Sequence, residues 1–195
     1  MAALNDQQYL HALVENERPA RMVGLFTGHS LKPADLTRLV DACVRSMREE
    51  DGGASLTVAP LGVQDVEQQH TFRVTVVDGA DASPHDCLVQ LFDMRDAASP
   101  HRGLLDHIGG RDEELSAAAS HLHQSAQTYL GVASGKLDAA ERVHAFQNLV
   151  SLFSSALGAA IVDPAAAIVT NDPGEWADAM EMSLQIEKEM GTLRR

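Results

Sequence analysis

The stretch SLTVAPLGVQDVEQQHTFRVTVVDGADASPHDCLVQLFDM, residues 55–94, decides the fold class of this chain. It holds three runs rich in β-branched and aromatic residues, separated by polar or glycine-bearing turns. In the middle run, Phe72, Val74 and Val76 alternate with polar residues, so we expect a strand with one buried face. Three consecutive strands are typical of an antiparallel meander.

The sequence on either side of this stretch predicts helices that alternate with single strands. The clearest helix runs from Pro33 to Glu50, where apolar residues recur at the helical spacing. We expect further helices over residues 6–16, from Asp112, from Asp138 with Glu141 completing a capping box, and from Asn171 or Asp172 to about Met190. Single strands are expected at RMVGLFTG (residues 21–28), at TYLGVA (128–133) and at 159–171, the last as one strand broken at Pro164 or as a tight pair.

This order of elements predicts a single α+β domain over residues 1–195. We expect a two-layer sandwich, in which a mostly antiparallel sheet of about five to six strands carries its helices mainly on one face. Pro60 cannot donate to a β-ladder, so the strand from Ser55 should lie at an edge or end there. Residues 1–19 should form an N-terminal helix and its lead-in, and residues 95–111 a long loop with room for one helical turn.

The composition argues against several classes of partner. The formal net charge is -13 at pH 7, and such a surface repels nucleic acid and anionic lipids. Because there is no long apolar run and no visible secretory signal, we expect a soluble, cytoplasmic protein. Cys43 and Cys87 are the only cysteines and should be free thiols. The scarcity of lysine beside alanine, arginine and glycine is typical of a GC-rich bacterial genome.

The histidines are the first candidates for a site. His121 and His123 would point about 200° apart on a helix, so they could not ligate one metal together. Leu122 between them lies on the apolar stripe of the predicted helix, which favours two boundary histidines. The alternative is a divalent-metal site, to which a loop and a helix would contribute His101, Asp106, His107, His121 and His123.

Two other motifs resemble functional elements without completing them. GVASGKLDAAE (residues 131–141) has three residues, not four, between its glycines, and a leucine where a Walker loop needs a hydroxyl residue. We interpret it as a glycine turn into a helix. His85, Asp86 and Cys87 supply the residue types of a thiol nucleophile, but Cys87 opens an apolar strand and should be a core residue. We predict no catalytic residue and no cofactor.

The last helix has more apolar surface than a helix packed on a sheet needs. One stripe consists of Trp176, Met180 and Leu184, and a second, on another side of the helix, of Met182, Ile186 and Met190. The second stripe packs either on the N-terminal helix, through Tyr9, Leu10 and Leu13, or on a partner protein or second copy. Candidate partner-binding residues are therefore Trp176, Met180, Met182, Ile186 and Met190.

A family resemblance covers the chain from RMVGLFTG through the last helix. It rests on HLHQSAQTYLGVASGKLDAAERVHAFQNLVSLFSSALGAAIVDPAAAIV, residues 121–169, followed by Trp176 in GEW. This arrangement resembles a bacterial domain-of-unknown-function family, the one numbered four-two-six-one. The resemblance implies no catalytic residue. Some small acidic bacterial proteins of similar design bind a partner, as toxin-neutralising proteins do.

These features favour a non-enzymatic, cytoplasmic bacterial protein that acts by protein–protein contact, in an immunity-type or stress-associated role. Its partner would be another protein or a second copy in a homodimer, and neither nucleic acid nor a membrane. The alternative is a metal-dependent hydrolase that uses the His/Asp cluster of residues 95–123. A third hypothesis is a small-ligand sensor with its pocket between sheet and helices.

Overall fold

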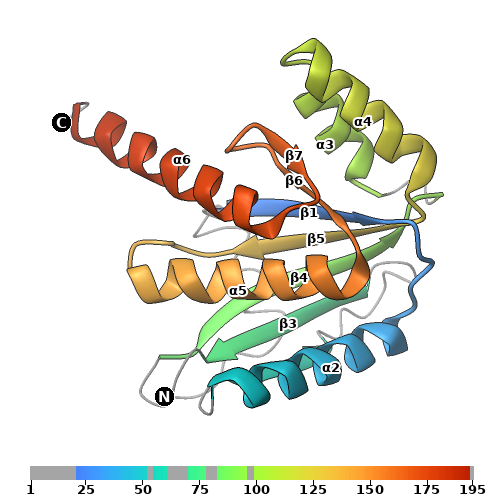
Figure 1. The fold of residues 1–195 in the computed structure, drawn as a ribbon, viewed down its shortest axis with the longest axis vertical. Helices are drawn as coiled ribbons and strands as arrows, with labels where there is room; N and C mark the ends of the chain where they lie inside the picture. The colour runs from blue at the N-terminus through green and yellow to red at the C-terminus, as the bar shows by residue number, and fades with distance from the viewer. Residues whose placement is uncertain (1–20, 52–54, 61–69, 78–82, 96–98, 194–195) are drawn as a thin grey trace.

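A computed structural model describes residues 21–51, 55–60, 70–77, 83–95 and 99–193. Its elements are, in chain order, β1 (Arg21–Thr27), α2 (Pro33–Asp51), β2 (Ser55–Pro60), β3 (His70–Val77), β4 (His85–Asp93), α3 (His101–Gly109), α4 (Glu113–Ser125), β5 (Thr128–Ser134), α5 (Ala140–Leu157), β6 (Ala160–Asp163), β7 (Ile168–Thr170) and α6 (Pro173–Leu193). The predicted α+β class is confirmed (Figure 1).

The strands form one antiparallel sheet in the order β2-β3-β4-β5-β1-β6-β7. Its first three members are the predicted meander, in which Val74 of β3 lies opposite Cys87 of β4. β2 is an edge strand that ends at Pro60, as the missing donor required. The sheet has seven described strands because residues 159–171 form the tight pair β6 and β7.

Helices cover both faces of the sheet. Residues adjacent in a strand point to opposite faces, and Leu25 and Phe26 belong to different apolar clusters. Leu25 lies in the cluster beneath α2, α5 and α6, whereas Phe26 lies in the cluster beneath α3 and α4. Three described helices therefore share one face, as expected, while α3 and α4 cover part of the other (Figure 1).

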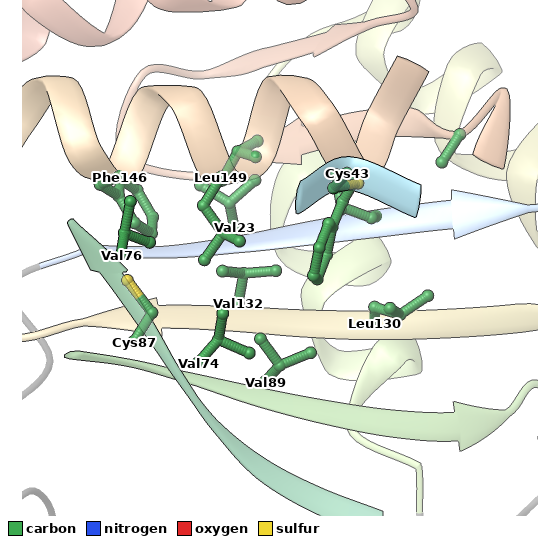
Figure 2. Packing of buried hydrophobic residues seen from close by; sticks show 14 of the residues in the cluster. Val23, Cys43, Val74, Val76, Cys87, Val89, Leu130, Val132, Phe146 and Leu149 are labelled. Atoms are coloured by element: carbon green, nitrogen blue, oxygen red, sulfur yellow. The ribbon is translucent and has the colours of Figure 1, made fainter. Parts of the chain in front are cut away.

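The larger core lies between the sheet and α5. Figure 2 shows Phe146 and Leu149 of α5 above the valines of the central strands, with Cys43 of α2 beside them. Both α5 side chains are 0% exposed. The apolar side chains that recur at helical spacing on α5 thus pack on those that recur at every second residue of the strands, and together they form one apolar layer.

The smaller core depends on two glycines that lie opposite each other in β1 and β5. Gly24 pairs with Gly131, and a Cβ at Gly24 would lie 2.6 Å from Cδ2 of Leu104. A Cβ at Gly131 would lie 3.0 Å from the Tyr129 hydroxyl oxygen. The missing side chains make room for an aromatic ring and for α3 on this face of the sheet.

A buried ion pair joins the start of β1 to the end of β6. The guanidinium of Arg21 donates from Nε (3.0 Å) and Nη2 (2.9 Å) to Oδ2 of Asp163, and both side chains are 0% exposed. Nε1 of Trp176 donates to the same oxygen at 3.0 Å. Nη1 of Arg21 donates to Ser183 Oγ at 2.9 Å, so one arginine holds a strand and α6 together.

The helix ends confirm some predictions and correct one. Asp112 caps α4 by accepting from the amide of Leu115 at 2.8 Å, and Asp172 accepts from that of Gly174 at 2.8 Å before α6. The capping box expected at Asp138 is wrong, because the N-cap residue of α5 is Ala139 and makes no side-chain cap. Asp138 instead accepts from Arg142 at 2.9 Å, one turn further on.

The predicted loop over residues 95–111 is wrong in its second half, which forms α3. Leu104, Leu105 and Ile108 lie on one side of this helix and are buried against the sheet. Gly109 and Gly110 end the helix. In the sequence analysis the same two glycines favoured a loop.

Two predictions concern other parts of the chain. The helix expected over residues 6–16 lies outside the described residues. Across the part of the chain that the structure describes, no helix combines the length and apolar character that a membrane span requires.

Replacing Asp163 tests the buried pair. Asp163→Ala leaves the Arg21 charge buried without its partner, and such a change costs about 3–5 kcal/mol of unfolding free energy. Urea denaturation followed by circular dichroism measures this loss. Asp138→Ala is the matched control, since its pair with Arg142 is solvent-exposed and contributes at most about 1 kcal/mol. Equal losses in both variants would contradict the assigned importance of the buried pair.

Candidate functional site

The two apolar stripes of α6 have different surroundings. The inner stripe packs on the core, where Trp176 and Met180 are 0% exposed and Leu184 is partly buried. The outer stripe, which we define as Met182, Ile186 and Met190, is exposed, with relative accessibilities of 65%, 54% and 49%. α6 crosses the sheet beside β6 and β7, and its C-terminal end projects away from the sheet (Figure 1).

The candidate partner-binding residues therefore separate into two groups. Trp176 bonds to Asp163, and its ring meets Phe146 edge-on with centroids 6.1 Å apart, so it is a core residue. Met180 is equally buried. Of the five candidates, all of them described, only the three residues of the outer stripe are exposed. Tyr9, Leu10 and Leu13, the alternative cover for this stripe, lie outside the described residues.

The outer face of α6 is also acidic. At 100° per residue, Glu175, Asp178 and Glu189 fall on the same side of the helix as the outer stripe. The basic residue of this helix, Lys188, falls on a different side. The surface is thus an apolar stripe bordered by carboxylates.

The histidines of α4 lie as predicted. The segment is helical, Leu122 is 8% exposed, and His121 and His123 are exposed on its two flanks. His123 lines a groove of about 620 Å³ between α3 and α4. His121 lines a separate hollow between α4 and β7.

The proposed metal ligands are brought together only in part. The rings of His101 and His123 lie with centroids 6.0 Å apart, and Asp106 lines the same groove as His123. His107 points elsewhere, because its Nε2 lies 3.2 Å from the guanidinium of Arg111 on the surface. Among the described residues, no three His, Cys, Asp or Glu side chains could hold one metal ion. The metal-dependent hydrolase gains no support from this arrangement.

His101 is the unusual member of this set. It is the first residue of α3, is 0% exposed, and its Nδ1 lies 2.7 Å from Ser99 Oγ. Its Nε2 is buried and has no hydrogen-bond partner. Burial, followed by the nearby charges of His123 and Arg102, lowers the pKa of His101 below its ordinary value. Folding therefore favours the neutral form of the His101 ring.

Sequence reasoning missed a second buried histidine. Nε2 of His85 lies 2.8 Å from the Oγ of Ser134, across the ends of β4 and β5. Burial, reinforced by the positive charge of Arg142, lowers the pKa of His85. Ser134 is 0% exposed, so its hydroxyl is not presented to a substrate. This contact joins the start of β4 to the end of β5. The two residues are 49 apart in the sequence, so no local pattern predicts the contact.

Comparison with known proteins gives no match: no protein-family model, curated protein or solved structure matches this chain. The resemblance to the domain-of-unknown-function family stays a prediction.

The remaining motifs have structural roles. GVASGK is the junction at which β5 ends and the chain turns toward α5, as the glycine-turn interpretation predicted. Cys87 is a core residue at 0% exposure. Burial raises the pKa of Cys43 to about 11, and burial together with the charge of Asp86 raises the pKa of Cys87 further.

Thiol labelling tests this view of the cysteines. Because the thiolate is the reactive form and both thiols are buried, neither Cys43 nor Cys87 should react with a disulfide reagent in native protein at pH 7.5. Both thiols should react at once when the protein is denatured. The denatured Cys87→Ala variant should show a single reactive thiol, that of Cys43. Rapid labelling of either thiol in the native protein would contradict the packing described here.

Proposed function

We propose that this protein acts by binding a partner protein through the outer face of α6, and that the partner presents apolar and basic side chains. The observation that carries the proposal is the exposure of Met182, Ile186 and Met190 on a helix whose inner stripe packs on the core through Trp176 and Met180. Exposed apolar side chains that form a continuous stripe are typical of interaction surfaces.

The anchoring of α6 supports this role. Ser183 accepts from Arg21, and Glu187 lies 3.6 Å from the same guanidinium, both on the side facing the sheet. Together with the Trp176 bond, these contacts fix the rotation of the helix about its axis. A surface held in place before binding loses little conformational entropy when a partner arrives.

Charge favours a different protein over a second copy as the partner. Two copies facing each other through α6 would bring six carboxylates together, from Glu175, Asp178 and Glu189 of each. A basic partner would instead pair with them, which speeds encounter and suppresses wrong partners. An immunity-type role, in which an acidic protein covers a basic surface, would use this chemistry.

A designed peptide tests the proposal. The probe is an 18-residue helix with leucines on one face and lysines along both borders, titrated by fluorescence anisotropy. Met182→Glu combined with Ile186→Glu should weaken its binding at least about 100-fold, since each buried apolar side chain contributes about 1.5–3 kcal/mol. The variant should retain the wild-type circular dichroism spectrum, because both side chains are exposed.

Three controls keep the result interpretable. A scrambled lysine–leucine peptide should bind no better to the wild type than to the variant. A peptide bordered by glutamates should bind neither. Equal affinity of the lysine-bordered peptide for wild type and variant would refute the proposal. So would a concentration-dependent dimer by light scattering that the double variant abolishes, because the stripe would then belong to a second copy.

A further inference from the structure

The α3–α4 pair is an excursion between two strands that are themselves neighbours. β4 pairs with β5 from Cys87 to Asp93, so Asp93 at the end of β4 lies opposite Thr128 at the start of β5. The amide of Met94 donates to the carbonyl of Gln127 at 2.9 Å and closes the base of the excursion. α3 and α4 could therefore move away from the sheet without breaking a strand pairing.

Helices α3 and α4 and strand β5 of the sheet meet at the ring of His101. His101 is the first residue of α3. The centroid of its ring lies 6.0 Å from that of His123 of α4, on which it stacks, and 6.4 Å from that of Tyr129 of β5. Its Nε2 has neither solvent nor a hydrogen-bond partner. A proton added there would create a buried cation with no group to receive its hydrogen bond.

The surrounding charges oppose that proton. His123 and Arg102, the two charged neighbours that act on His101, are both basic. Burial raises the pKa of Tyr129 to about 12, so this phenol stays neutral throughout the acidic range.

The carboxylates nearby are placed elsewhere. Asp106 of α3 is exposed and lines the groove. Glu113 and Glu114 lie in the first turn of α4, at the other end of that helix from His123. Asp93, at the end of β4, is engaged by the guanidinium of Arg95.

We propose that the α3–α4 pair is a proton-sensitive flap: uptake of a proton by His101 in mildly acidic solution releases the pair from the sheet while the core beneath α5 and α6 stays folded. An exposed histidine titrates near pH 6.5, and the closed flap holds the ring neutral to a lower pH. Closure is thus fully favoured above about pH 6.5 and is lost progressively as the pH falls below it. Release would uncover the aromatic rings of Phe26, Phe92 and Tyr129.

Hydrogen exchange of the full chain between pH 7.5 and 5.0 tests the flap. After correction for intrinsic exchange rates, the opening constant of α3 and α4 amides should rise by up to about tenfold per pH unit below pH 6.5. Trp176, the single tryptophan, is buried in the other core and reports on it independently. Its fluorescence should stay constant over the same range.

Variants of His101 identify the group responsible. His101→Phe and His101→Gln should both flatten the pH dependence of the opening constant, whatever they do to its absolute value. His107→Gln, on the exposed side of the same helix, should keep the wild-type slope. Three results would overturn the proposal: an opening constant in the wild type that does not change with pH, the same slope in both His101 variants as in the wild type, or a change in Trp176 emission that accompanies the opening.

Discussion

The buried pair between Arg21 and Asp163 is the constraint on which the rest of the structure depends. It joins two strands at a point where both side chains have left water, and it is tolerable only because every polar atom nearby has a partner. Trp176 and Ser183 supply two of those partners from α6, and the amides of Ala165 and Ala166 donate to the other oxygen of Asp163. The charge pair therefore positions a helix as well as two strands, and one residue of β1 determines where the C-terminal part of the chain lies.

This arrangement explains why α6 has two different faces. The inner side must present Trp176 and Ser183 to the ion pair, which leaves Met182 and Ile186 no route into the core. Their exposure is a consequence of helix geometry once the inner contacts are fixed. The same geometry places the carboxylates beside them, so the apolar and acidic character of the outer face arise together.

Much of the fold could be predicted, because long elements carry their own periodicity. The helix from Pro33 and the strand from His70 were clear, and the Leu122 stripe correctly separated its two histidines. α3 was missed because nine residues with a glycine near each end hold only one short apolar stripe. Contacts between distant residues leave no such pattern. The ion pair joins residues 142 apart, and the His85–Ser134 contact joins residues 49 apart, so neither has a local signal.

The connection from β4 to β5 has a consequence for how this chain tolerates change. Its two ends lie side by side, so the sheet would keep its register whether residues 94–127 were longer, shorter or replaced by a tight turn. Such a replacement would remove α3 and α4, which cover Tyr129 and the paired glycines of β1 and β5. Insertions and deletions should therefore accumulate in this segment only as far as the aromatic rings stay covered.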